Sequence, residues 1–180
     1  MKKKNLLKNI ALNGVIAALY VVLSLISGPL AFLGGAIQFR LSEILNLLIF
    51  FNPFYIFGVT LGCFLTNIIS LYGWPDLIFG TLATLISGCL IIVVSKTIKK
   101  LLIASLMPVL INALIIPFVI FLYDMETPLY SFYWSSFFFV GLGEFIVVFC
   151  IGYPIFFILV NKTKNFKNVI LLTQNEKIKW

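Results

Sequence analysis

The stretch Gln38-Phe39-Arg40-Leu41-Ser42-Glu43 places two opposite charges at the start of an apolar run. Arg40 is the sole arginine of the chain, and Glu43 follows it by three residues. Positions three apart share one face of a helix, so we expect both side chains to point the same way. Charges within a membrane-spanning segment are costly and commonly mark function. Two interpretations stay open: an Arg40–Glu43 ion pair that fixes a helix end, or one wall of a pocket for a small polar solute.

The composition is that of an integral membrane protein. Of 180 residues, 62% are hydrophobic and 11% are charged, whereas soluble domains carry about 25% charged residues. The mean hydropathy is +1.13. This length accommodates about six spans of about 20 residues each and leaves no room for a soluble domain. We therefore predict an all-α integral membrane protein in which residues 1–180 form a single transmembrane domain.

Six transmembrane helices are predicted from the apolar runs and from the turn residues between them. Glycine and proline break the first run at Ser27-Gly28-Pro29, and the apolar, Gly-rich segment Leu30–Ile37 is predicted to form a lid over the site. The spans cover roughly residues 10–26, 38–51, 53–71, 76–95, 101–123 and 132–160.

The lysines lie in four groups, each at the end of a predicted span or in a tail: residues 2–8, 96–100, 162–167 and 177–179. Basic residues accumulate on the cytoplasmic side of membranes. The pattern therefore predicts that both termini are cytoplasmic and that residues 30–37 and 124–130 lie outside. The net charge of +7 is not interleaved with exposed aromatic residues, which argues against a nucleic acid partner.

The chain offers little for metal or covalent chemistry. It contains no histidine, and Cys63, Cys89 and Cys150 lie singly in apolar runs. We therefore expect no metal site, no cofactor and no disulfide framework. Walker A, HExxH and GxSxG motifs are also missing from the sequence, so we expect no enzymatic activity.

Polar side chains gather in the outer halves of the second to sixth predicted spans. Because the hydrocarbon holds no water, each should face the protein interior or a wet cavity. Serine and threonine often bond to their own backbone or pack between helices instead, whereas a carboxylate such as Glu144 needs a partner. The candidate substrate-binding residues are Arg40, Glu43, Asn67, Asp76, Thr81, Thr84, Asn112 and Glu144.

Small residues form a ridge along the first predicted span: Gly14 and Ala18 lie four residues apart, with Ala11 and Ala17 nearby, and Ala11, Gly14 and Ala18 are the candidate docking residues. Such ridges let two helix backbones approach closely. The partner helix belongs either to this chain or to another subunit, and the pattern leaves both open.

The segments Ile37–Glu43, Gly58–Asn67 and Asp76–Leu85 resemble the QueT family. These are queuosine-precursor transporters, the substrate-binding S components of energy-coupling factor (ECF) transporters. The resemblance covers about residues 11–160. It is most specific between Gln38 and Thr84, where polar residues agree in type and spacing, and Asn112 and Glu144 are its marks in the second half.

The resemblance implies a six-helix S component of the bacterial cell membrane that binds its solute near the outer face. It implies three partners: a transmembrane ECF coupling subunit and two cytoplasmic ATPases. Related S components dock on the coupling subunit through an Ala-x-x-x-Ala motif on the first helix, and here Gly14-x-x-x-Ala18 stands in its place. The implied solute is a 7-deazaguanine base, namely queuine or its cyano or aminomethyl precursor.

The guanine-like edge of such a base offers two adjacent N–H donors, which one carboxylate can accept side by side. Glu144 is the candidate, with Asn112 or Asn67 for the remaining positions. Glu43 would hold Arg40 or receive the cationic amine of the aminomethyl base or queuine. The alternatives are an S component for another vitamin or nucleobase-like solute, a small membrane enzyme or scaffold, and a channel built on Glu43 and Glu144.

Overall fold

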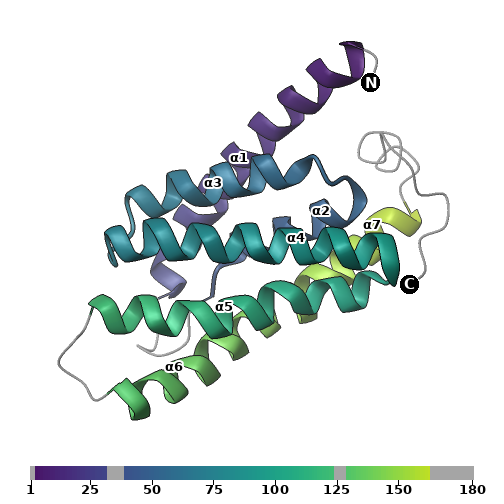
Figure 1. Ribbon diagram of the computed structural model, residues 1–180. Helices are drawn as coiled ribbons and strands as arrows, with labels where there is room; N and C mark the ends of the chain where they lie inside the picture. Colours follow the sequence, from purple (N-terminus) through teal and green to yellow (C-terminus); the bar gives the residue numbers. More distant parts are fainter. Residues whose placement is uncertain (1–2, 32–38, 124–128, 163–180) are drawn as a thin grey trace.

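The computed structural model describes residues 3–31, 39–123 and 129–162, and all regular elements in these ranges are helices (Figure 1). Consecutive elements join end to end, so the described chain forms six helical rods. In chain order the elements are α1 (Lys3–Ala31), the 3-10 helix η1 (Leu41–Leu47), α2 (Leu48–Phe51), α3 (Tyr55–Ile68), the π-helix η2 (Asp76–Gly80), α4 (Thr81–Thr97), α5 (Leu101–Tyr123), α6 (Leu129–Glu144), the π-helix η3 (Phe145–Gly152) and α7 (Tyr153–Lys162).

The six rods confirm the predicted all-α membrane fold. Four are long and apolar enough to cross a membrane: Leu6–Gly28, Asp76–Thr97, Leu101–Leu122 and Tyr133–Lys162. Two are shorter apolar helices, Leu41–Phe51 and Tyr55–Ile68.

The predicted break at Ser27-Gly28-Pro29 is wrong, because α1 continues to Ala31. Gly and Pro are tolerated in membrane helices, and a proline this close to a helix end removes a single backbone hydrogen bond. Residues 32–38, which make up most of the predicted lid, and residues 124–128 of the predicted outer loop lie outside the described residues.

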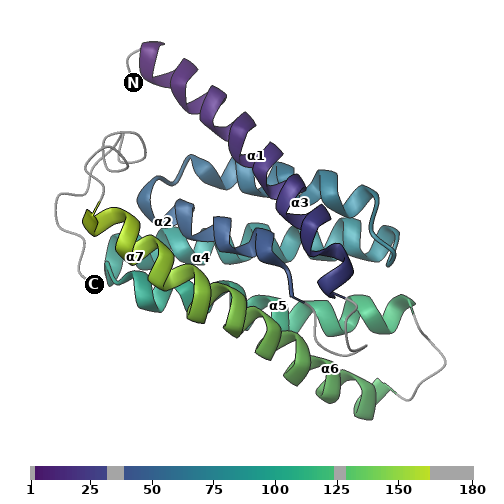
Figure 2. The same ribbon diagram turned by 180° about the vertical axis from the view of Figure 1, so that it is seen from behind.

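The rod formed by η1 and α2 is the centre of the bundle. Residues 46–52 are all buried, and a helix buried on every side belongs to the interior rather than to the lipid surface. Helices α3, α4 and α5 lie side by side in Figure 1, and the rod from α6 to α7 runs along α5. Figure 2 shows α1 crossing over α3 and leaving the bundle at its N-terminal end.

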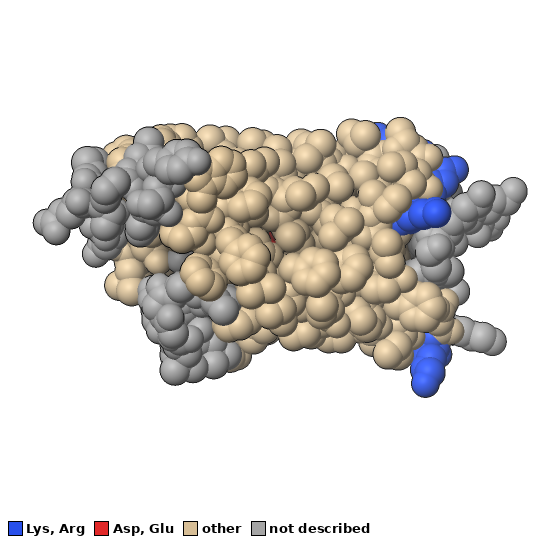
Figure 3. All heavy atoms as spheres, turned by 90° about the horizontal axis from the view of Figure 1, so that it is seen from below, with Lys and Arg blue, Asp and Glu red and all other residues tan. Residues whose placement is uncertain are grey.

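Charged residues divide the molecule into two ends. The described lysines lie near the start of α1, at the junction of α4 and α5 and at the end of α7, and these parts form one end of the molecule, which we call the lysine end. In Figure 3 the basic side chains lie at this end, and the rest of the face shows a single small spot of acidic colour. Asp76 begins η2 and Arg40 directly precedes η1, at the ends of their rods farther from the lysine end, while Glu43 is in η1 and Glu144 ends α6. This division is the one that the lysine pattern predicts, and it keeps charges away from the lipid-facing surface.

Two glycines on α3 permit the close approach of α1. A Cβ atom at Gly58 would lie 2.7 Å from the backbone oxygen of Asn13, and one at Gly62 would lie 2.6 Å from Cβ of Tyr20. The side-chain oxygen of Asn13 also accepts a hydrogen bond from the Gly58 amide at 2.6 Å. The Gly-x-x-x-Gly spacing therefore fixes α1 on α3, as small residues do between membrane helices.

By contrast, the ridge of Ala11, Gly14 and Ala18 is exposed on α1 and faces away from the bundle. A Cβ atom added at Gly14 would meet nothing within 4 Å. The sequence left open whether the ridge packs within this chain or against another subunit. In the described chain this face of α1 is exposed, so the ridge does not pack within the bundle.

The two glycine environments give a matched test. Gly58→Ala should lower the free energy of unfolding by about 2 kcal/mol, because the added methyl overpacks a backbone contact. Gly14→Ala should be neutral or stabilising by about 0.5–1 kcal/mol, because alanine favours the helix and nothing obstructs it. Thermal unfolding of both purified variants in detergent measures the difference, and equal stabilities would refute the α1–α3 packing.

Candidate functional site

Arg40 directly precedes η1, as its N-cap residue. Its guanidinium donates to both carboxylate oxygens of Asp76, at 3.0 and 3.4 Å, and this is an ion pair across 36 residues of sequence. Asp76 is 1% exposed and the Arg40 side chain 20% exposed. Of the two interpretations left open for Arg40, an ion pair with Glu43 is thus not the one found among the described residues: Arg40 pairs with the start of the rod formed by η2 and α4.

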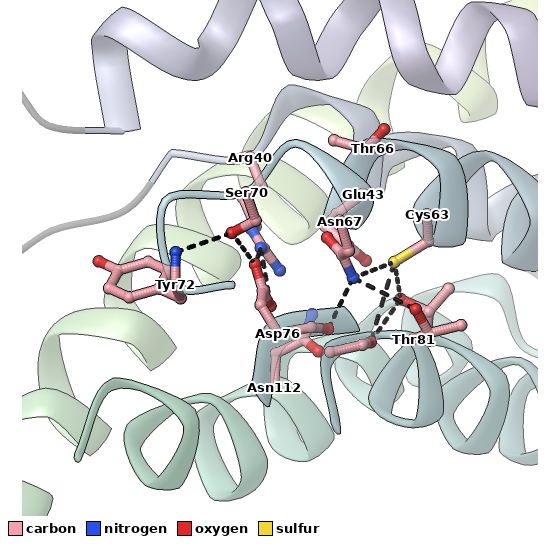
Figure 4. A network of polar contacts seen from close by, with 12 residues as sticks. Arg40, Glu43, Cys63, Thr66, Asn67, Ser70, Tyr72, Asp76, Thr81 and Asn112 are labelled. Carbon is pink, nitrogen blue, oxygen red and sulfur yellow. Dashed lines mark hydrogen bonds and ion pairs between the residues drawn. The ribbon is translucent and has the colours of Figure 1, made fainter. Parts of the chain in front are cut away.

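The turn between α3 and η2 completes this contact (Figure 4). The Ser70 hydroxyl donates to Asp76 Oδ2 at 2.6 Å, and the Tyr72 backbone amide donates to Ser70 Oγ at 3.3 Å. A Cβ atom at Gly80 would collide with Asp76 Oδ1 and approach Asn67 Nδ2. A glycine at position 80 thus lets the π-turn bring the Asp76 carboxylate between α3 and α4.

A pocket of about 180 Å³ opens beside this ion pair. It lies between the C-terminal part of α1, the start of η1 and the turn that follows α3. Its volume is below the range of about 300–1,000 Å³ for drug-sized ligands. Three predicted site residues line it: Arg40, Asn67 and Asp76. Tyr20, Ser24, Ser27, Ser42, Thr66, Ser70 and Tyr72 add polar groups to the lining.

Asn67, Thr81 and Thr84 take part in hydrogen bonds between α3 and the rod of η2 and α4. The Asn67 amide donates to the Asp76 backbone oxygen at 3.0 Å and to Thr81 Oγ1 at 3.3 Å (Figure 4). The Thr84 hydroxyl lies 3.1 Å from Cys63 Sγ and 3.3 Å from the Gly80 carbonyl oxygen. These contacts hold α3 against α4, the packing role that hydroxyl and amide groups take between membrane helices.

Glu43 lies inside the bundle, 0% exposed. The Tyr20 hydroxyl of α1 donates to its Oε1 at 2.6 Å, and the Asn46 amide donates to its Oε2. Both donors are uncharged. Burial of a carboxylate needs hydrogen bonds of this kind, because water is excluded.

Asn112 near the middle of α5 and Glu144 at the end of α6 form a second buried group. The Asn112 amide donates to Glu144 Oε1 at 3.0 Å, and each residue is 1% exposed. The element η1, which carries Glu43, packs against α5 and against η3, which Glu144 directly precedes. The two carboxylates of Glu43 and Glu144 therefore belong to one buried region that η1, α5 and α6 enclose.

Three oxygens of this region have no hydrogen-bond partner among the described residues: Asn46 Oδ1, Asn112 Oδ1 and Glu144 Oε2. Each asparagine directs its NH₂ group to a carboxylate oxygen, so its carbonyl oxygen is the free end. All three open positions are acceptors. An unpaired buried polar atom costs about 1–3 kcal/mol, so this region favours a solute that is rich in N–H donors.

Two residues of this region escaped the sequence prediction. Tyr20 and Asn46 both donate to Glu43, yet neither was among the candidate residues. Asn46 follows Glu43 by three residues on the same helical rod, a spacing that could have revealed it. Tyr20 contacts Glu43 only through tertiary packing, which no local spacing indicates. Among the described residues no three His, Cys, Asp or Glu side chains gather to hold a metal.

Disrupting the ion pair should destabilise the fold. Asp76→Asn should lower the free energy of unfolding by about 2–3 kcal/mol, because Arg40 loses its anionic partner while largely buried. In double-mutant cycles with Arg40→Gln, the coupling energy with Asp76→Asn should exceed that with Glu43→Gln. A larger coupling with Glu43, measured by thermal unfolding, would contradict the assigned pair.

The queuosine precursor transporter QueT of Lactococcus lactis subsp. cremoris is 45% identical over 84 residues, which cover 47% of this chain and 49% of that protein. The match thus spans about half the length of that relative. No solved structure gave a significant match. The QueT transporter family matches residues 10–161, and with most of its length covered the chain belongs to that family.

Proposed function

We propose that the chain is the substrate-binding subunit of an ECF-type importer and that its solute is a 7-deazaguanine queuosine precursor: queuine or its cyano or aminomethyl precursor. Two observations support the solute: the similarity to the queuosine precursor transporter of Lactococcus and the three open acceptors at the centre of the bundle. A transport subunit of this kind catalyses no reaction itself, and partner ATPases supply the energy.

The observation that carries the proposal is the buried Asn112–Glu144 pair. Glu144 keeps one oxygen open and Asn112 keeps its carbonyl oxygen open. A guanine-like edge has adjacent N–H groups at the ring nitrogen and the exocyclic amine, and these match two such acceptors. A site of this kind rejects analogues without the donors, because its own buried oxygens would stay unpaired.

The pocket beside Arg40 and Asp76 is the approach to this region in our proposal. It lies at the end of the molecule opposite the lysine end. We assign this opposite end to the outside of the cell, because basic residues favour the cytoplasmic side. Solute would enter between the end of α1 and the turn after α3. Both chain termini are cytoplasmic in this arrangement.

The coupling subunit would dock on the exposed face of α1. Ala11, Gly14 and Ala18 are exposed on α1, and a Cβ atom added at Gly14 would meet nothing within 4 Å. The same helix also exposes apolar side chains, each 50–55% exposed: Val15, Val22 and Leu25. Small residues on an exposed apolar helix suit close packing against another membrane helix. This surface supports a protein partner within the bilayer.

Glu144→Gln tests the solute site. It keeps the shape but replaces one acceptor oxygen by a donor, so it should weaken binding of the aminomethyl base about 10- to 100-fold. Ser105→Ala is the control, since the Ser105 hydroxyl bonds to the Leu102 backbone oxygen of its own helix. Calorimetry on purified protein measures both. Parent-like affinity of Glu144→Gln would make Glu144 a structural residue and refute the site.

Gly14→Leu and Ala18→Leu test the docking surface. Both should abolish uptake in cells that hold the coupling subunit and ATPases, because the added side chains keep the helices apart. Binding by the isolated subunit should be unchanged. Leu114→Trp, at an exposed position of α5, should leave uptake intact. Normal uptake by both α1 variants would contradict docking on this face.

A further inference from the structure

We propose that the site selects a cationic, amine-bearing base over a neutral one, and that Glu43 with Asn46 is the receptor for the amine. The proposal rests on the function proposed above and specifies which member of the solute class fits best. It starts from the balance of charge among the described residues of the bundle centre.

In the middle of the bundle the described carboxylates outnumber the described cations. Arg40 is the one described cation away from the lysine end, and its hydrogen bonds go to Asp76. Among the described residues, Glu43 and Glu144 receive hydrogen bonds from neutral donors only: Tyr20, Asn46 and Asn112. A buried carboxylate without a cation either takes up a proton or receives a positive charge from elsewhere. A cationic solute would supply that charge.

Glu43 is better placed than Glu144 for the amine. Glu144 lies beside the open oxygen of Asn112, which suits the flat N–H edge of the base. Glu43 lies beside the open oxygen of Asn46, whose NH₂ group is already bonded to the carboxylate. An ammonium group has three donors and no acceptor. The carboxylate and the Asn46 carbonyl oxygen together offer it a charge-assisted bond and a second acceptor.

The two receptors agree with the shape of the solute. In a 7-deazaguanine the N–H edge is on the six-membered ring, while the 7-substituent is on the five-membered ring. One solute would therefore place its edge on Glu144 and its substituent toward Glu43, since η1 with Glu43 packs against η3, the segment that follows Glu144. The aminomethyl base and queuine carry an amine at this substituent, and the cyano base carries a neutral nitrile with no donor.

Calorimetric titration of purified protein with the aminomethyl and the cyano base tests the proposal. The parent should bind the aminomethyl base about 10- to 100-fold more tightly, the value of a hydrogen bond to a charged group. Glu43→Gln should remove this preference by weakening the aminomethyl base alone. The control Ser105→Ala, at a hydroxyl that bonds to the Leu102 backbone oxygen of its own helix, should retain the preference.

The outcomes separate the two levels of the account. Equal affinity of the parent for both bases, or an equal loss for both in Glu43→Gln, overturns the charge selection while leaving the proposed function in place. No binding of either base by the parent overturns the proposed function and this inference with it. If Glu43→Gln does not fold, Glu43→Asp takes its place, beside the ratio of the parent's affinities for the aminomethyl and the cyano base. Loss of the preference in Glu43→Asp, or equal affinities in the parent, refutes the amine receptor.

Discussion

The need to place one guanidinium and three carboxylates inside a membrane-embedded bundle governs this structure. Without water, each charge must find a partner within the protein. Asp76 meets Arg40 from the turn after α3, and Tyr20 of α1 meets Glu43. Asn112 of α5 meets Glu144 of α6. The charges thereby tie α1 and the rod of η2 and α4 to the central rod of η1 and α2, and they join α5 to α6.

The two groups of charges differ in how far the protein itself satisfies them. Arg40, Asp76, Ser70 and the α3–α4 contacts form a network in which hydrogen bonds meet the charges. The region of Glu43 and Glu144 keeps three open acceptors. A fully paired network stabilises a fold, whereas buried atoms left open lower its stability. We read the first group as structural support and the second as the place where a solute completes the hydrogen bonds.

Irregular helix geometry accompanies these positions. Asp76 begins the π-helix η2, and Glu144 stands directly before the π-helix η3. Such π segments are frequent at functional sites in proteins. Glycines allow the close contacts nearby: Gly80 makes room for Asp76, and Gly58 and Gly62 let α1 reach the bundle so that Tyr20 contacts Glu43.

The sequence predicted the helical membrane fold, because composition and span lengths are set by the bilayer. It also placed Arg40 and Glu43 at the centre of the chain's organisation, because charges are rare in such spans. The sequence left an Arg40–Glu43 pair open and did not indicate Asp76 as the partner of Arg40, since helical spacing relates only near neighbours and Asp76 lies 36 residues away. Tyr20 was missed for the same reason. The location of the α1 ridge on an exposed face required the packing of α1 on α3.

A structure of the protein with the aminomethyl base bound tests the central claim most directly. The account predicts the ring nitrogen and exocyclic amine about 3 Å from Glu144 Oε2 and Asn112 Oδ1, with the amine of the 7-substituent beside Glu43 and Asn46. A base held in the pocket at Arg40 and Tyr72, with Glu144 and Asn112 still bonded only to each other, would contradict it.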